Sequence, residues 1–247
     1  MTTHNRLEKI MTRTAVVAGV GPGLGAALVR KFVAEGCRVG MLARSPDYLA
    51  ELEDELGARN ALAIPTDITE DGAVTAAFAQ VKDRFGPVDI LVNHASLSNW
   101  KGLMDITPAE FERAWRVTVL GALHCCRVAA ADMLTDKRGG SILFTGATSS
   151  IRGRQGAIDF SSAKFALRGL ADSMARELWP QGVHVAHVLI DGIIDSATVR
   201  RQMNLAPDEP LLSPDDIARV YWSLTEQEPS AWSFELEVRP HTEEFYG

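Results

Sequence analysis

Cysteine is scarce in this sequence and forms no recognisable pattern. The 247 residues contain three cysteines, Cys37, Cys125 and Cys126, and none lies in a CxxC spacing. Three cysteines cannot all pair within one chain, and their spacing matches no metal site. We therefore expect a cytoplasmic protein with reduced cysteines and no bound metal.

Long apolar runs and basic clusters are also missing. No apolar stretch approaches the roughly 20 residues that a membrane span requires, and residues 1–13 lack the apolar core of a secretory signal. The chain carries 25 basic and 32 acidic residues, a net charge of −7, and has no basic run. Neither a nucleic acid nor a membrane is therefore expected as a partner.

Hydrophobic residues make up 46% of the chain, which is enough for a large core in one domain. We expect a tail over residues 1–13 and a single domain over residues 14–247. Short apolar segments alternate there with helical periodicity, which predicts an α/β fold with a Rossmann-like, doubly wound parallel sheet that binds ligands at the carboxyl ends of its strands. The expected strands span residues 14–18, 38–42, 61–64, 88–92, 141–145, 183–190 and 231–238. The expected helices span residues 24–36, 48–56, 108–133 and 159–179, with two more capped by Thr69 and Ser213 and a loop at about 193–212 as a candidate substrate lid.

A glycine cluster follows the first expected strand. It can be read as G-x-x-x-G-x-G from Gly19 through Gly23 to Gly25, or as G-x-G-x-x-A from Gly21, and the first reading fits better because Gly19 directly follows the strand. Glycine allows a tight turn and a close approach by a pyrophosphate, and the helix opened by Leu24 would direct its N–H groups at the phosphates. A plain strand-to-helix turn also uses glycine, so the cluster alone is weak evidence for a dinucleotide site.

The end of the second expected strand bears on the choice of cofactor. An acidic residue there would bind the adenosine ribose 2′-hydroxyl, but the sequence has Ala43 and Arg44 instead. Arg44 can pair with a 2′-phosphate, which favours NADP(H) over NAD(H), although an arginine in solvent is the simpler alternative. After the third strand, Asp67 and Ile68 are expected beside the adenine.

Several spaced motifs together resemble the short-chain dehydrogenase/reductase family over about residues 14–238. They are the glycine cluster, Asp67, the segment Asn93-His94-Ala95-Ser96 where the family has Asn-Asn-Ala-Gly, Lys164, and Asp191-Gly192 where the family has Pro-Gly. The resemblance implies a nicotinamide cofactor, a small-molecule substrate and a homodimer or homotetramer paired through helices 108–133 and 159–179. It implies cofactor contacts from Gly19, Gly23, Leu24, Gly25, Arg44, Asp67, Ile68, Asn93, Lys164, Gly192 and Ser196.

The same resemblance implies a catalytic tetrad of Asn, Ser, Tyr and Lys, and here the chain departs from the family. The tyrosine position, four residues before Lys164, is Phe160; the serine position is Ala147 and the asparagine position is Thr118. In the family the tyrosine donates a proton to the carbonyl oxygen, the serine holds that oxygen, and the lysine binds the nicotinamide ribose. Only Lys164 remains as a catalytic residue.

Other side chains could replace the missing acid. His94 is the first candidate because an unperturbed imidazole titrates near neutrality, and the others are Ser149, Ser150, Asp159 and Ser161. Each also has an ordinary structural explanation as a cap, a loop hydroxyl, a helix N-terminal charge or a packed polar residue. His184 and His187 lie on an expected strand and are read as structural, while Tyr246 could act only in a neighbouring subunit.

Two functions follow from these residues. The first is an NADP(H)-dependent oxidoreductase that acts on a small substrate with an activated C=N, C=C or C=O bond. The alternative is an NADP(H)-binding protein without hydride transfer, serving as a sensor or partner subunit. The intact cofactor motifs favour the first, and the changes at Thr118, Ala147 and Phe160 favour the second.

Overall fold

The fold is built on a seven-stranded parallel sheet in the order β3-β2-β1-β4-β5-β6-β7. The computed structural model describes residues 12–206 and 209–242. The strands are β1 (Thr14–Ala18), β2 (Arg38–Ala43), β3 (Ala61–Pro65), β4 (Ile90–Asn93), β5 (Gly140–Thr145), β6 (Val183–Ile190) and β7 (Glu235–Val238). The chain reverses its direction of travel across the sheet between β1 and β4, which is the point where a doubly wound sheet opens a ligand crevice. The predicted fold class is confirmed.

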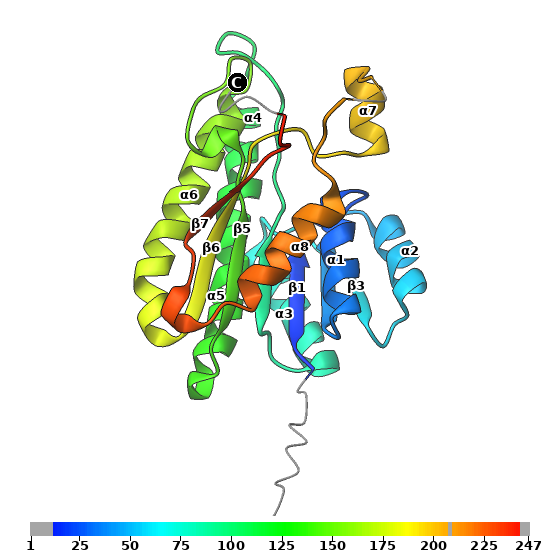
Figure 1. The fold of residues 1–247 in the computed structure, drawn as a ribbon, viewed down its shortest axis with the longest axis vertical. Coiled ribbons are helices and arrows are strands. Elements are labelled where there is room, and N and C mark those ends of the chain that lie inside the picture. The colour runs from blue at the N-terminus through cyan, green and yellow to red at the C-terminus, as the bar shows by residue number, and fades with distance from the viewer. Residues whose placement is uncertain (1–11, 207–208, 243–247) are drawn as a thin grey trace, which may run out of the picture.

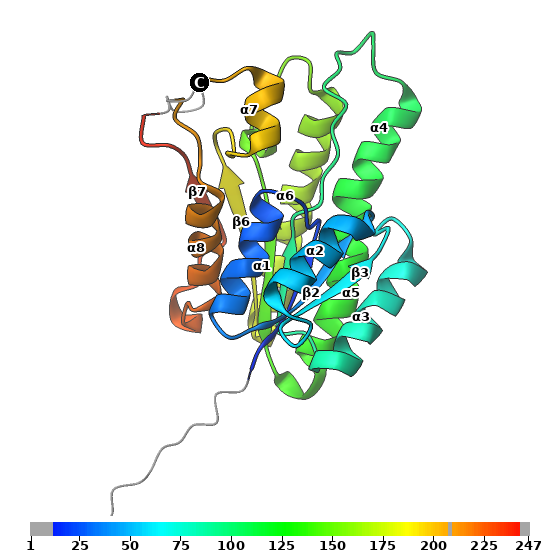
Figure 2. The ribbon, with the colours of Figure 1, turned by 90° about the vertical axis from the view of Figure 1, so that its right-hand side faces the viewer.

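Helices cover both faces of this sheet (Figure 1). One face carries α1 (Leu24–Ala34), α2 (Pro46–Leu56) and α8 (Pro214–Thr225), and the other carries α3 (Asp71–Phe85), α5 (Gly121–Leu134) and α6 (Ile158–Leu178). The helix α4 (Pro108–Trp115) continues through a π-helical turn, Arg116–Leu120, into α5. The short helix α7 (Ala197–Met203) and the loop of residues 94–107 rise above the carboxyl ends of the strands, as Figure 2 shows from the side.

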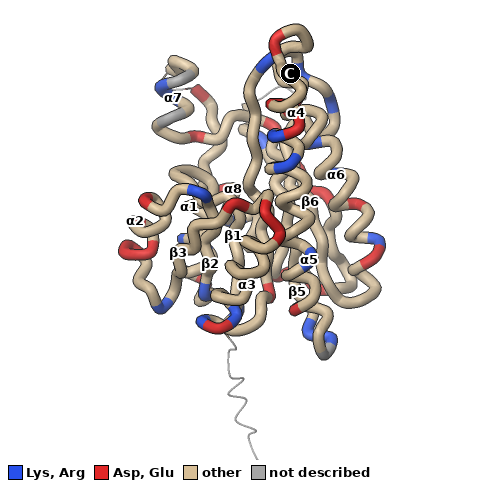
Figure 3. Tube along the Cα trace, turned by 180° about the vertical axis from the view of Figure 1, so that it is seen from behind, with Lys and Arg blue, Asp and Glu red and all other residues tan. Residues whose placement is uncertain are grey.

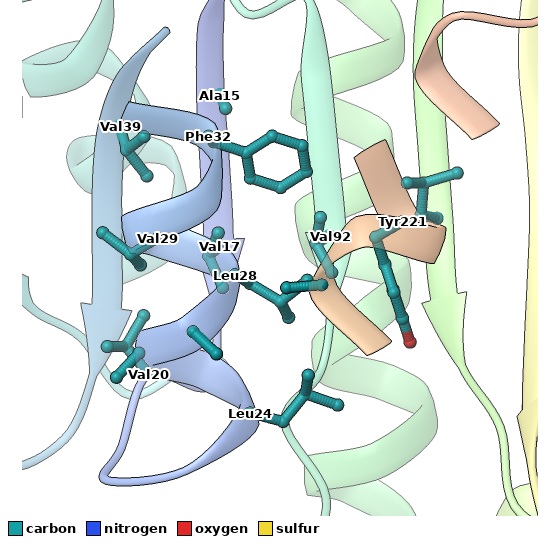
Figure 4. Packing of buried hydrophobic residues seen from close by; sticks show 14 of the residues in the cluster. Ala15, Val17, Val20, Leu24, Leu28, Val29, Phe32, Val39, Val92 and Tyr221 are labelled. Carbon is teal, nitrogen blue, oxygen red and sulfur yellow. The ribbon is translucent and has the colours of Figure 1, made fainter. Parts of the chain in front are cut away.

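Each face of the sheet has its own apolar core. On the first face, Leu28 and Phe32 of α1 pack with Val17 of β1 and with Tyr221 of α8, and all four side chains are fully buried (Figure 4). On the second face, Phe78, Phe144 and Met133 lie in the other cluster. Burial of this much apolar surface is the main favourable term in folding, and it holds the carboxyl ends of the strands in one rigid edge.

Two local expectations are wrong. Thr69 does not cap the third helix, which begins at Asp71 after Glu70; its hydroxyl instead donates to Asp67 Oδ1 at 2.8 Å. The N-cap position is Glu70, one residue after Thr69, and its side chain forms no capping hydrogen bond. The predicted loop at 193–212 contains α7, because Ser196 caps that helix by accepting from Val199 N at 3.1 Å.

The long helix also corrects the expectation about apolar stretches. By length and composition, Pro108–Leu134 meets the requirement for a membrane span, with a mean hydropathy of 1.4 over its most apolar window. Within the fold, 56% of that window is buried, and core helices of soluble proteins pass the same test. The predicted capping box at its start is present, since Glu110 N donates to Thr107 Oγ1 at 3.2 Å and Thr107 N donates to Glu110 at 3.0 Å.

Candidate active site

The glycine cluster forms the turn from β1 into α1, and its glycines are needed for different reasons. Gly19 has φ +103, and a Cβ there would lie 2.4 Å from Ala95 N on the loop after β4. A Cβ on Gly25 would lie 2.8 Å from Gly19 O. At Gly19 and Gly25, neighbouring backbone atoms therefore leave no room for a side chain. Gly23 has φ +141, yet a Cβ there would meet only Ser196 Cβ, at 3.9 Å.

The space above Gly23 is open, at the start of a helix where a phosphate group could bind. Helix α1 begins at Leu24 without a side-chain cap and with no acidic residue in its first turn. The N–H groups and positive dipole of that turn therefore remain available to an anion. Ser196, at the start of α7, lies beside this loop although it is distant in the sequence, and its contact with a cofactor stays a prediction.

Arg44 lies exposed directly after β2, where the adenosine ribose is expected. No ion pair among residues 12–206 and 209–242 holds its guanidinium, and helix α2, which follows it, carries acidic residues and no basic ones (Figure 3). The pKa of Asp67 is lowered first by the hydrogen bond from Thr69 N, then by the Thr69 hydroxyl and the positive charge of Arg44, while burial opposes them. Arg44 and Asp67 are thus electrostatically coupled at one corner of the sheet edge.

Two predicted cofactor residues have their side chains turned into the fold. The side chain of Ile68 is buried, and a Cβ on Gly121 would lie 2.6 Å from its Cγ1. Asn93 is also buried, and its Nδ2 donates to Cys126 Sγ at 3.3 Å. Contacts from these two residues to a cofactor would therefore use the backbone.

Gly192 follows β6, at the carboxyl ends of the strands. Its φ is +146, and a Cβ there would lie 2.9 Å from Pro240 Cδ. The preceding Asp191 pairs with Arg239 at 2.9 Å and accepts a hydrogen bond from the Thr148 hydroxyl. This ties the segment after β6 to the segment after β5, while Tyr246 lies outside the described residues.

Lys164 lies at the centre of the site, on α6. Only 2% of its surface is exposed, and Nζ donates to the Thr145 backbone carbonyl at 2.7 Å. Burial lowers the pKa of this amine to about 8, since removal from water disfavours the charged form. The ring of Phe160, one turn earlier, has its centroid 5.5 Å from Nζ.

The two other changed positions hold groups that serve the local structure. Thr118 is fully buried in the π-helical turn, and its Oγ1 accepts from Leu97 N at 3.3 Å. The backbone N of Ala147 donates to Ser150 Oγ at 3.1 Å, so the Ser150 hydroxyl stabilises the turn of residues 147–150. Neither position presents a free hydroxyl beside Lys164.

Asp159 and two serines also have structural partners. The carboxylate of Asp159 accepts from Asn99 N and Asn99 Nδ2, both at 2.8 Å, and from Phe160 N at 2.8 Å. Ser161 Oγ lies 3.5 Å from Ser149 Oγ and accepts from Arg154 N at 3.2 Å. These contacts favour a structural role for Asp159, Ser149 and Ser161 over a role as the catalytic acid. Asp159 holds the loop of residues 94–107 in place.

His94 belongs to a chain of polar side chains that is partly buried. Its Nδ1 lies 3.2 Å from Thr145 Oγ1, which in turn lies 2.7 Å from the Tyr221 hydroxyl. Burial, with a smaller contribution from the charge of Lys164, lowers the pKa of His94 to about 4. The lowered pKa keeps the imidazole neutral at pH 7, which makes His94 a poorer proton donor than an unperturbed histidine.

Tyr221 is the member of this chain that the sequence did not indicate. It occupies the apolar stripe of α8, and Figure 4 shows its hydroxyl directed toward the end of the sheet that carries Leu24 and the glycine turn. A buried tyrosine hydroxyl needs a hydrogen-bond partner, which is a weak signal that the sequence does contain. Tyr221 is fully buried, and burial raises its pKa.

The histidines of β6 have structural partners. His184 lies within hydrogen-bond distance of two backbone carbonyls, Leu224 O at 3.1 Å and Ser233 O at 2.9 Å. His187 Nδ1 lies 2.9 Å from Glu235, and burial is the main cause that lowers its pKa to about 4. A Cβ on Gly146 would lie 2.3 Å from its ring, so His187 packs beneath the backbone that leads to Ala147.

Surface hollows lie at both ends of the sheet in the described part of the chain. A hollow of about 390 Å³ lies between the segment 210–213, α8 and the end of β7, and includes the buried Leu212. A second one lies at the amino ends of the strands, beside Arg13 and Asp89. Neither hollow includes Lys164 or Phe160.

Comparisons with known proteins agree with this geometry. The family model described as short chain dehydrogenase matches residues 13–205. The chain is 29% identical over 225 residues to a 3alpha-hydroxysteroid dehydrogenase of Mediterraneibacter gnavus, covering 86% of this chain and 89% of that protein.

Solved structures show the same relationship. A metagenomic short-chain oxidoreductase in complex with NADP has a TM-score of 0.79 and 28% identity, covering 92% of this chain and 97% of that one. The 3-ketoacyl-(acyl-carrier-protein) reductase of Brucella melitensis, complexed with NADH, has a TM-score of 0.81 and 25% identity, covering 92% and 96%. With the glycine turn, the parallel sheet and the buried Lys164 in place, the chain belongs to the short-chain dehydrogenase/reductase family, whose members are oxidoreductases that use a nicotinamide cofactor.

Proposed function

We propose that this oxidoreductase uses NADP(H) and reduces a small organic substrate whose C=N, C=C or C=O bond is already activated. One observation carries the proposal. The sequence keeps the glycine turn and Lys164, yet the residue one turn before Lys164 is Phe160, whose ring centroid lies 5.5 Å from Nζ and which has no proton to give.

The choice of NADP(H) rests on the two ends of the proposed cofactor site. The open space above Gly23 and the uncapped start of α1 suit the pyrophosphate. Arg44, which forms no ion pair with any residue in the described part of the chain, suits a 2′-phosphate. One solved relative holds NADP and another holds NADH, so the relatives alone favour neither.

The cofactor, when bound, supplies the hydride. Lys164 keeps a partly protonated amine at pH 7 to 8, with its pKa of about 8, and would hold the nicotinamide ribose by hydrogen bonds. Phe160 presents an apolar ring that excludes water from the same place. Positioning donor and acceptor can supply about 7–11 kcal/mol of the barrier, so hydride transfer remains possible without an enzymic acid.

The missing acid restricts the substrate. General acid catalysis is worth about 10²–10⁴ in rate, and the neutral His94 is a poor source of that proton. An iminium ion needs no proton as the hydride arrives, and a conjugated enone delocalises the negative charge that results. Such substrates can collect any proton from solvent after the transfer, whereas simple ketones cannot.

The second candidate is a protein that binds NADP(H) without transferring hydride. It is favoured by the changes at Thr118, Ala147 and Phe160 together, because the Thr118 hydroxyl already accepts from Leu97 N at 3.3 Å and the other two side chains have no polar atom. The two candidates differ in one measurable step, the oxidation of bound NADPH.

Absorbance at 340 nm distinguishes these functions when the protein is given NADPH and matched acceptors. A cyclic imine and a conjugated enone should be reduced, and an unactivated cyclic ketone of the same size should be nearly inert. Brisk reduction of the ketone would contradict the proposal and make His94 the first residue to replace. NADPH that binds tightly but is never oxidised would favour the binding protein.

We also propose a homodimer or homotetramer that acts in the cytoplasm. The partly exposed aromatic rings of Trp115 and Phe165, 39% and 45% exposed, support assembly through α4–α5 and α6. Exposed apolar side chains on long helices are typical of subunit interfaces, and closed symmetry is the usual outcome.

A further inference from the structure

We propose that the substrate of this site is a planar, conjugated anion, which stacks on Trp100 and pairs with Arg154 beside Phe160. This inference rests on the proposed function, and it names the chemical class of the substrate. It is carried by four side chains that follow one another from the buried centre of the site to its surface: Lys164, Phe160, Trp100 and Arg154.

The contacts in this row are short and continuous. The rings of Phe160 and Trp100 have centroids 5.4 Å apart with a 37° tilt. Lys164 Nζ lies 5.5 Å from the Phe160 ring, and the Arg154 guanidinium lies 5.7 Å from the Trp100 ring. Exposure rises along the row, from 2% for Lys164 to 58% for Trp100. Trp100 therefore exposes part of its indole to solvent, next to the ring of Phe160.

The position of Trp100 is held by the chain around it. Its φ is +50, a conformation that non-glycine residues rarely adopt and that persists only when the surroundings impose it. On one side Asn99 gives two hydrogen bonds to the buried Asp159, and on the other Lys101 O accepts from Ile158 N at 3.4 Å. The loop is thereby clamped to the start of α6, which Figures 1 and 2 place beside the carboxyl ends of the strands. Asp159 is a positioning residue for the indole.

The charge beside the indole is positive. Arg154 is exposed, and no ion pair of the described residues involves it. The neighbouring cation Lys101 is neutralised by Glu110 at 2.7 Å, and the Asp159 carboxylate is occupied by three N–H donors. A guanidinium that lies beside an aromatic face and forms no ion pair with a described residue is suited to a carboxylate on a flat molecule.

Phe160 fits the same substrate. A tyrosine here would place a polar hydroxyl at the end of the ring, whereas phenylalanine keeps the surface apolar at this position between Lys164 and Trp100. A conjugated substrate can lie along this surface with its anionic group at Arg154 and its activated bond toward Lys164. Conjugation then serves both stacking and the delocalisation that the proposed reaction requires.

The test measures binding without turnover, by calorimetry of the full chain in saturating NADP⁺ at low salt. The probes are trans-cinnamate, which is planar and anionic, its neutral isostere trans-cinnamamide, and the flexible anion 3-phenylpropanoate. Cinnamate should bind about tenfold or more tightly than the amide, as expected for a hydrogen bond to a charged group. It should also bind more tightly than 3-phenylpropanoate, because the flexible chain must be ordered on binding.

Three variants assign the effect to residues. Arg154→Gln should reduce the affinity for cinnamate to that for the amide and leave the amide unchanged. Trp100→Ala should weaken both planar probes, while Trp100→Phe should retain most of their binding and guards against a misfolded alanine variant. The matched control is Arg59→Gln, since Arg59 is exposed between α2 and β3 at the opposite edge of the sheet. It should change nothing.

Equal binding of cinnamate and cinnamamide, or a preference that survives Arg154→Gln, would overturn the inference. Failure of the planar-anion inference can be distinguished from failure of the proposed reductase function. Reduction of neutral enones without any preference for anions would leave the reductase and remove the anion site. Selective binding of cinnamate by a protein that never oxidises NADPH would keep the planar-anion site and remove the reaction.

Discussion

Restoring the missing acid should convert this site into one that reduces simple ketones. The double variant Phe160→Tyr with Ala147→Ser adds a phenol one turn before Lys164 and a hydroxyl on the segment after β5. The Lys164 amine, whose Nζ lies 5.5 Å from the present ring, carries the positive charge that favours proton release from a phenol. General acid catalysis then predicts a gain of up to about 10²–10⁴ in the rate of ketone reduction.

The single variants separate the two contributions. Ala147→Ser alone should give much less, because a hydroxyl that holds the oxygen cannot replace the proton. Steady-state NADPH oxidation with an unactivated cyclic ketone measures the gain, and the NADPH affinity, titrated by fluorescence, should stay unchanged as the control. A double variant that binds NADPH normally and gains nothing on ketones would refute the assignment of these two positions.

Further predictions concern the cofactor, the assembly and the response to acid. Arg44→Ala should remove the preference for NADPH over NADH, which we expect to be about tenfold or more; equal affinities in the wild type would exclude Arg44 from the site. Light scattering should give a dimer or tetramer, and Phe165→Asp should shift it toward a monomer; a wild-type monomer at micromolar concentration would contradict the interface. The pKa values of His94 and His187 are both lowered to about 4 from 6.5, so the unfolded chain binds more protons than the folded one between these values. The free energy of unfolding should therefore fall as pH drops from 6.5 to 4, by up to about 3 kcal/mol for each histidine, and urea titrations of His187→Gln should show a smaller fall.

The features that sequence reasoning found are those with a local cause. The glycine turn at Gly19, Gly23 and Gly25 follows from backbone conformation, and the buried stripes of α1 and α6 follow from helical spacing. The strand order could be anticipated because alternating strands and helices have few allowed connections. Helical spacing likewise predicts Lys164 one turn after Phe160, because the two residues lie four positions apart in α6.

The features that it missed depend on contacts between distant segments. Asp159 anchors Asn99, which lies 60 residues away in the sequence, and Thr145 meets Tyr221 across 76 residues. Periodicity reports which face of an element is buried, but not which polar groups meet there. The indole of Trp100 beside Phe160 likewise depends on how a loop folds back on α6, and no local pattern specifies that.

Hydride transfer itself is the central claim, and transfer of an isotope tests it most directly. The protein is mixed with NADPH that carries deuterium at both hydrogen positions of the nicotinamide C4 and with a planar enone that carries a carboxylate, and the product is analysed by mass spectrometry after a single turnover. The account predicts one deuterium in the product and a rate that changes little in heavy water, because no enzymic proton moves with the hydride. A product without deuterium, while NADPH is bound at saturation, would contradict it.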